Sequence, residues 1–342
     1  MKAWFQTDIM KLEMRGVECP IAQGGQVQVK LQATGICGSD LHYLEHGRIG
    51  DYVVEYPFIL GHESAGIVTA VGEGVTSLKI GDRVALEPGC PCGICEFCRS
   101  GRYNLCPDVI FFATPPYHGT LAEYVVHPAD MCFRLPDSVS SLEGALVEPL
   151  AVGFHAAMQG GARIGQTAMV IGCGCIGLVT LLALKSMGVS RVFLSDVIDV
   201  RIQKAVELGA ERVFDAKREE VETALLDMTQ GAGVDLVIET AGTARTQAQC
   251  VQLVKRGGTI VYVGMSSGGT AALDLNALIG KEATVKTVFR YRNLYPAAIA
   301  AVADGLPLHS ILSDVMPFGR AGEAFVNNIQ HKDSIVKMAL EY

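Results

Sequence analysis

Four cysteines in one short stretch of the chain could bind a single metal ion. Cys92, Cys95 and Cys98 are separated by two C-x-x-C steps, and Cys106 follows after a longer gap. Four thiolates can surround a zinc ion tetrahedrally, and a site closed in this way leaves no position for a substrate. The spacing therefore predicts a structural zinc that stabilises a lobe with little core of its own.

Two other uses of these cysteines are open. A redox C-x-x-C pair is expected near a βαβ pattern, which the surrounding sequence lacks. The first three cysteines resemble the start of a bacterial ferredoxin run, but the last gap is longer and no proline follows at the expected spacing. Cys90 is left over and could replace one of the ligands. The N-terminus has no signal-peptide pattern, so the 11 cysteines favour metal ligands and free thiols in the cytoplasm over a disulfide scaffold.

Three further potential ligands lie upstream of this cluster. Cys37 is followed by Gly-Ser-Asp, and His62 and Glu63 come directly after Gly61. Zinc accepts thiolate, imidazole and carboxylate, and a catalytic zinc keeps one position open. From these residues alone, a buried cysteine and an ordinary His-Glu pair remain the simpler interpretation.

A glycine-rich turn lies near the middle of the chain, with glycines at 172, 174 and 177 between an apolar run (168–171) and a helical pattern (178–184). This is the strand, turn and helix of a dinucleotide site, in which the pyrophosphate lies at the helix N-terminus. Residues 167–184 carry no charge, so a membrane span is the alternative, but the glycines interrupt the run like a turn.

The elements around this turn alternate between strands and helices. Helices are expected at 200–208 and 221–228, and strands at 168–171, 191–195, 212–214, 235–239, 259–263 and 284–288. Such alternation predicts an α/β fold with a doubly wound parallel sheet, which binds its ligand at the carboxyl ends of the strands.

Asp196 ends the second of these strands, about 20 residues after Gly177. An acidic residue there binds the adenosine ribose of NAD and repels the 2′-phosphate of NADP, although a helix-capping aspartate is the alternative. Arg201 follows and leaves the use of both cofactors open.

The first third of the chain is typical of an all-β unit. Residues 26–33 alternate between apolar and polar side chains, and short strands are expected at 65–71 and 83–86. Near the C-terminus, 297–304 is a helical stretch and 335–340 a closing strand. The length of 342 residues suits two domains, and the net charge of −8 without a basic block argues against nucleic acid or a membrane as partner.

Together these motifs resemble the zinc-dependent medium-chain dehydrogenases, and most closely the sorbitol (L-iditol) and xylitol dehydrogenases. The family motifs are Cys37–Asp40, Gly61–Glu63 with Gly66, Gly81–Val84, the four cysteines and the glycine turn. The closer resemblance rests on His42-Tyr43, Glu45–Gly50, Gly101–Leu105, Phe111–Pro116, Glu143–Leu150 and Val288–Tyr291.

The resemblance implies a Rossmann domain that binds NAD (148–288) and a mostly β, GroES-like catalytic domain (1–147, completed by 289–342). It implies one structural and one catalytic zinc per chain, with Cys37, His62 and Glu63 as catalytic ligands. Glu148 stands where the alcohol dehydrogenase branch has a cysteine, and which of the two carboxylates binds the metal directly is open. A homotetramer is also implied.

The same resemblance assigns roles around the metal and the cofactor. Ser39 and His42 would relay a proton outward. Substrate hydroxyls would be bound by Tyr43, Glu148, Arg290 and Tyr291, and Phe112 would either line the pocket or belong to the core. Besides the three glycines and Asp196, the cofactor would contact Ile176, Arg201, Val263, Gly264, Met265, Val288, Phe289 and Arg290.

The activity implied is oxidation of a secondary hydroxyl of a polyol to the ketose, with hydride transfer to NAD. An L-threonine 3-dehydrogenase, or a secondary alcohol or diol dehydrogenase, would use the same chemistry. A protein that binds NAD or zinc without catalysis is the alternative from another class. It has no need of an open metal site, so the presence of Cys37, His62, Glu63 and Glu148 together argues against it.

Overall fold

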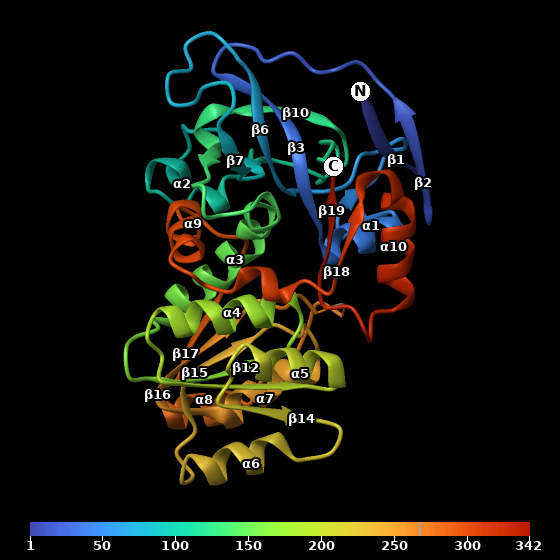
Figure 1. The fold of residues 1–342 in the computed structure, drawn as a ribbon. Coiled ribbons are helices and arrows are strands. Elements are labelled where there is room, and N and C mark those ends of the chain that lie inside the picture. Colours follow the sequence, from blue (N-terminus) through green and yellow to red (C-terminus); the bar gives the residue numbers. More distant parts are fainter. Residues whose placement is uncertain (267) are drawn as a thin grey trace. The chain divides into compact units, whose positions relative to one another are not determined.

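The computed structural model describes residues 1–266 and 268–342, which divide into two compact units (Figure 1). The first unit comprises residues 1–148, 295–305 and 312–342, and the second comprises 149–294 and 306–311. The division falls inside helix α3 (Ser141–Gly160), between Glu148 and Pro149.

The first unit is built on a seven-stranded sheet with the order β11-β7-β6-β3-β19-β18, in which β10 also pairs with β3. Its strands are β3 (Gln26–Ile36), β6 (Glu63–Val71), β7 (Arg83–Leu86), β10 (Tyr124–Pro128), β11 (Cys132–Arg134), β18 (Asp314–Pro317) and β19 (Met338–Glu341). Alternate residues of β3 are buried, as the sequence pattern predicts, and Val27, Val29 and Leu31 form part of a core with Val68 and Leu86. The three strands predicted in this region are confirmed.

The C-terminal strand of the chain pairs with a strand from its N-terminal part. Strand β19 pairs antiparallel with β3, and in Figure 1 the red β19 lies beside the blue β3. The sequence predicts a strand from Ile335, but β19 begins at Met338. The reason is a turn after helix α10 (Ala321–Gln330), where the amides of Ser334 and Ile335 donate to the carbonyl of His331.

Smaller elements complete the first unit, and several of its helices, α10 among them, were not predicted. The all-β interpretation missed α1 (Gly38–His46) and the short α2 (Glu96–Arg99). The predicted helix near 297–304 is α9 (Tyr295–Ala303). Two-stranded antiparallel sheets are formed by β1 (Lys2–Asp8) with β2 (Lys11–Gly16), β4 (Arg48–Ile49) with β5 (Tyr52–Val53), and β8 (Gly89–Cys90) with β9 (Ile110–Phe111). Short 3₁₀ turns are η1 (Tyr103–Leu105), η2 (Ala129–Met131) and η4 (Phe318–Arg320).

The second unit is a parallel six-stranded sheet with the order β14-β13-β12-β15-β16-β17. This is the strand order of the doubly wound dinucleotide-binding fold, so the predicted fold class is confirmed. The strands are β12 (Thr167–Ile171), β13 (Arg191–Asp196), β14 (Arg212–Asp215), β15 (Val234–Glu239), β16 (Val254–Tyr262) and β17 (Thr284–Thr287). Connecting helices are α4 (Cys175–Ser186), α5 (Asp199–Glu207), α6 (Val221–Met228), α7 (Ala244–Leu253) and α8 (Leu275–Lys281), and η3 (Leu308–Ile311) also belongs here.

The uncharged run at 167–184 is strand β12, the glycine turn and helix α4, as the preferred interpretation predicts. Among the described residues, no helix is long and apolar enough to cross a membrane.

Candidate metal and nucleotide sites

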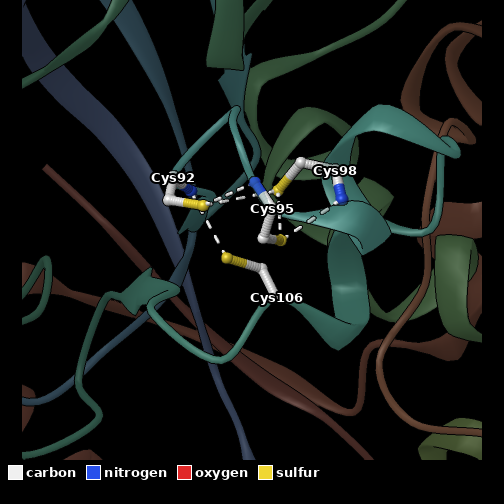
Figure 2. A group of neighbouring side chains, drawn as sticks. All are labelled: Cys92, Cys95, Cys98 and Cys106. Carbon is white, nitrogen blue, oxygen red and sulfur yellow. Dashed lines mark hydrogen bonds between the residues drawn. The ribbon is translucent and has the colours of Figure 1, made fainter.

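The four cysteines of the predicted structural site, which we call the cysteine lobe, lie together (Figure 2). The Cys95 and Cys98 sulfurs are 3.4 Å apart, and those of Cys92 and Cys98 are 3.9 Å apart. Four sulfurs at a Zn–S distance of about 2.3 Å from one ion would be separated by about 3.8 Å. The spacing of the sulfurs therefore fits a tetrahedral zinc site.

Backbone amides in the lobe point at the same sulfurs. The amide of Cys95 donates to the Cys92 sulfur, and that of Cys98 to the Cys95 sulfur, each at 3.4 Å. Donation from Ile94 and Cys95 lowers the pKa of the Cys92 thiol to about 7. Burial and the neighbouring thiols instead raise the pKa of Cys98 to about 12. A cation is therefore needed to hold all four as thiolates. Cys90 lies elsewhere, with its sulfur 3.8 Å from Nδ1 of His127.

A second group of potential ligands is formed by Cys37, His62 and Glu63. One ligand atom from each lies within 4.8 Å of the others. Cys37 precedes α1 at the end of β3, and Glu63 begins β6, where it pairs with Gly35. A side chain at Gly35 would collide with the Glu63 carboxylate, so this glycine makes room for the ligand. Thiolate, imidazole and carboxylate together suit zinc.

Asp40 orients two of these ligands and was not singled out from the sequence. Its carboxylate is fully buried, accepts from the Cys37 amide at 3.0 Å and from the Gly61 amide at 2.9 Å, and lies 3.5 Å from Nδ1 of His62. Burial opposes its ionisation, but His62 and the two amides outweigh burial and hold the pKa of Asp40 below its usual value. A carboxylate behind a metal-binding histidine fixes the ring orientation. The Cys-Gly-Ser-Asp spacing was the available signal, because Asp40 caps the helix that Cys37 begins.

Lys337 is the second residue that the sequence analysis missed. Its ammonium group is almost fully buried and donates to Glu63 Oε1 at 2.6 Å and to the Ile36 carbonyl at 2.9 Å. Lys337 and Glu63 are 274 positions apart, so no local pattern could reveal the pair. The lysine therefore fixes the Glu63 carboxylate beside the other two potential ligands, Cys37 and His62.

Glu148 is buried, but it is not in this group. Among the described residues, the set whose ligand atoms lie within 4.8 Å of one another contains Glu63 and not Glu148. Glu148 is near enough to Glu87 for its charge to act there. Burial, and then the charge of Glu148, raise the pKa of Glu87 to about 7 against the opposing hydrogen bond from Tyr103. That hydrogen bond, from the Tyr103 hydroxyl, is 2.6 Å long.

The other residues expected around the metal differ in their exposure. Ser39 is half-buried and His42 is exposed one helical turn later, where its ring contacts that of His46. The Tyr43 side chain is 4% exposed within a hydrophobic core. Phe112 stacks on the His127 ring with centroids 4.6 Å apart and packs against the core of the large sheet.

In the second unit, each glycine of the turn has a separate reason. Gly172 has a φ of 99°, a conformation that favours glycine. A side chain at Gly177 would collide with the Gly172 carbonyl, whereas one at Gly174 would meet nothing within 4 Å. The backbone at Gly174 is therefore open to a ligand at the N-terminus of α4, where a phosphate group is favoured.

Asp196 ends β13 beside this turn. Its carboxylate accepts from the Cys173 amide at 2.6 Å and from the Val197 and Ile198 amides at 2.7 and 2.9 Å. A cavity of about 770 Å³ extends from here, with Gly172, Gly174, Asp196 and Arg201 in its wall. The wall also contains Glu219, Glu220, Glu222, Asp274 and Arg245. Acidic side chains outnumber arginines in this wall, and their negative charge disfavours the additional 2′-phosphate of NADP.

The residues expected at the nicotinamide end lie in two further segments. The amides of Val263 and Gly264 both donate to the Glu239 carbonyl, and the next side chain, that of Met265, is 80% exposed. Beyond β17, the Arg290 guanidinium lies over the Phe289 ring at 4.8 Å from its centroid, and Arg290 has a φ of 54°. Val288 and Ile176 are half-buried, and Tyr291 is buried.

Comparison with known proteins gives consistent matches. Residues 23–137 match the alcohol dehydrogenase GroES-like domain, and residues 175–304 match the zinc-binding dehydrogenase domain. The chain is 40% identical over 338 residues to the uncharacterized zinc-type alcohol dehydrogenase-like protein YdjJ of Escherichia coli, covering 95% of this chain and 94% of the relative. It is 38% identical over 339 residues to sorbitol dehydrogenase of Bacillus subtilis, covering 99% and 96%. The crystal structure of 2R,3R-butanediol dehydrogenase from Bacillus subtilis matches with a TM-score of 0.91 and 32% identity, covering 100% of this chain and 99% of that one.

Proposed function

The chain belongs to the zinc-binding dehydrogenases, a family of oxidoreductases, and within it we propose an NAD-dependent polyol dehydrogenase that oxidises a secondary hydroxyl of a sugar alcohol to the ketose. The observation that carries the proposal is the grouping of Cys37, His62 and Glu63 within 4.8 Å. Three protein ligands leave the fourth coordination position of a zinc ion open to substrate, whereas four cysteines fill all four positions. The similarity to sorbitol dehydrogenases supports a polyol as substrate.

When bound at this group, zinc supplies Lewis-acid polarisation of the substrate hydroxyl, and NAD accepts the hydride. The residues of the chain hold this arrangement in place. Asp40 orients His62 and the turn at Cys37, while Lys337 orients Glu63.

We propose that Ser39 accepts the hydroxyl proton and that His42 passes it to solvent. The two residues lie three positions apart on α1, which places them on one side of the helix. Half-burial of Ser39 and exposure of His42 suit a path that leads outward. Glu148, Arg290, Tyr291 and Tyr43 are the proposed partners of the other substrate hydroxyls.

NAD is the proposed cofactor because of Asp196 and the acidic wall of the cavity. Replacing Asp196 by Ser should reduce the preference for NAD over NADP, measured as the ratio of the two kcat/KM values. The homotetramer and the identity of the polyol remain predictions.

The test is formation of NADH by zinc-replete protein with sorbitol, xylitol, galactitol, 2,3-butanediol and L-threonine. We expect kcat/KM for at least one polyol to exceed those for the last two by about tenfold or more, because several polar partners are satisfied only by a polyol. A higher value with 2,3-butanediol would favour a diol dehydrogenase, which the similarity to butanediol dehydrogenase makes the second candidate. No turnover with any substrate would favour a binding protein.

The proton path has its own test. Ser39→Ala and His42→Ala should change the pH dependence of kcat, whereas His46→Ala, at the neighbouring exposed ring, should not. An unchanged profile in the first two variants would contradict the relay. Turnover that survives complete removal of zinc would contradict the mechanism.

A further inference from the structure

Glu239, the last residue of β15, is a fully buried acid with no assigned role. One carboxyl oxygen, Oε1, accepts from the amides of Ala241 and Gly242 at 2.9 and 2.8 Å and from the Thr246 hydroxyl at 2.8 Å. The other oxygen, Oε2, has no hydrogen-bond partner among the described residues. Burying a carboxyl group costs free energy unless it is hydrogen-bonded, and within the described part of the chain only one of the two oxygens of Glu239 is.

Two of the three donors to Oε1, the amides of Ala241 and Gly242, belong to the turn that follows β15, and the third, Thr246, lies in the first turn of α7. Ala241 and Thr246 line the cavity that contains Gly172 and Asp196. The same turn is fixed to the glycine turn, because the Thr240 amide and hydroxyl both donate to the Ile171 carbonyl at 2.9 Å. Glu239 therefore holds one wall of the nucleotide cavity.

A second turn, at the end of β16, is held by the main chain of Glu239, whose carbonyl accepts from the amides of Val263 and Gly264 at 2.9 and 3.0 Å. This main-chain contact does not depend on the side chain, which acts on the second turn through Gly242. A side chain at Gly264 would collide with the Gly242 backbone and would come within 2.8 Å of Glu239 Oε2. The two turns thus meet directly over the Glu239 side chain.

We propose that Glu239 is a positioning residue that fixes residues 240–243 and residues 263–265 to each other and thereby sets the affinity for the nicotinamide half of the cofactor. This inference rests on the proposed function, which places Val263, Gly264 and Met265 beside the nicotinamide. Asp196, at the end of β13, holds the adenosine half through a separate set of amides.

The position calls for a hydrogen-bond acceptor more than for a charge. Burial raises the pKa of Glu239 in spite of the opposing hydrogen bonds from Thr246, Gly242 and Ala241. An amide oxygen can accept the same three hydrogen bonds, whereas a leucine of similar size cannot. Glutamine should therefore replace glutamate at this position, and leucine should not.

The test is equilibrium binding of NADH and of AMP, which carries the adenosine end alone, to wild type, Glu239→Gln and Glu239→Leu. Glu239→Leu leaves the Ala241 and Gly242 amides and the Thr246 hydroxyl without their acceptor inside the fold, so both turns should lose their fixed positions and we expect the Kd of this variant for NADH to rise about tenfold or more. Its Kd for AMP should stay within about threefold, and both constants should stay within about threefold in Glu239→Gln. A general loss of structure would weaken both ligands together.

A second pair of variants decides the question if Glu239→Leu does not fold. Thr246→Val removes one of the three donors to Oε1, whereas Thr246→Ser retains the hydroxyl. We expect weaker NADH binding in the first variant and near-normal binding in the second. An unchanged Kd for NADH in Glu239→Leu would overturn the inference, and if that variant does not fold, an unchanged Kd in Thr246→Val would overturn it. The inference would also fail if NADH and AMP lost the same affinity, or if Glu239→Gln weakened NADH binding as much as Glu239→Leu. Wild type that binds AMP but not NADH would overturn the proposed function as well.

Discussion

The two metal-ligand groups of the first unit are built in opposite ways. The cysteine lobe takes all its ligands from residues 92–106, and three of the four are half-exposed. In the other group, His62 and Glu63 are buried, and their supporting residues, Asp40 and Lys337, come from α1 and from the tail before β19. The ligands of the lobe come from one short segment that a bound metal would hold together, whereas the second group depends on the packing of the whole sheet.

This difference suits different uses of a bound metal. In the lobe, the bond energy of a zinc ion would replace the hydrophobic core that a short segment lacks. In the buried group, the fold already fixes the potential ligands, so a bound metal would be available for chemistry. Variants of the two groups should therefore fail in different ways.

The largest effect is expected from Cys37→Ala. Removal of one of three ligands should lower kcat/KM by at least about 1,000-fold, because Lewis-acid stabilisation amounts to several kcal/mol. Zinc analysis should show that the metal of the lobe is retained, and the melting temperature should change little. Activity within about tenfold of wild type would contradict the assignment of Cys37.

Cys98→Ser should lower the stability of the protein more than its activity. Loss of the lobe metal should lower the apparent melting temperature by about 5–10 °C, since folding free energy is lost with the ion. The kcat of the protein that remains folded should fall much less than in Cys37→Ala. Thermal unfolding with and without added zinc checks this, and Cys90→Ser, at a cysteine outside the group, is the matched control. A full loss of kcat in folded Cys98→Ser would remove the contrast between the two groups.

Lys337→Met tests how the buried group is held. Removing one partner of a buried ion pair typically costs about 3–5 kcal/mol because the other charge is left uncompensated. Bound zinc would compensate Glu63, so the loss in unfolding free energy should be smaller in zinc-loaded protein than in metal-free protein. Lys337→Arg, which keeps the charge, is the control. Equal losses with and without zinc would show that Glu63 does not face the metal.

The same contrast explains what could be predicted from the sequence. The cysteine spacing and the glycine turn are local, and the sequence pattern predicted the six strands of the parallel sheet but missed β10, β11 and β18 of the first sheet. Helix α1 was missed because Gly38, Ser39 and Asp40 are typical of turns, although Asp40 in fact caps that helix. Lys337 could not be found at all, because only the pairing of β19 with β3 brings it to Glu63. The late start of β19 has a local cause, since the turn after α10 takes up the residues before it.

The smallest effect is expected at Glu87, a buried carboxyl that is linked to the cysteine lobe through Tyr103 and that also responds to the charge of Glu148. Tyr103, inside the cysteine lobe, donates to it, and the charge of Glu148 acts on it from the other side. Burial first, and Glu148 second, raise its pKa from 4.5 to about 7. Between these values the folded protein binds a proton that the unfolded chain does not, so stability should fall as the pH rises from about 4.5 to about 7.

In Glu87→Gln this contribution, up to about 3 kcal/mol, should vanish, and unfolding free energies measured from pH 5 to 8 should show a flatter dependence than wild type. Tyr103→Phe removes the hydrogen bond that lowers the pKa of Glu87, so this pKa should rise further and the decline in stability should extend to higher pH. An identical pH dependence in Glu87→Gln and wild type would mean that Glu87 is ionised in the fold. Glu87 would then provide no electrostatic link between Tyr103 in the lobe and Glu148.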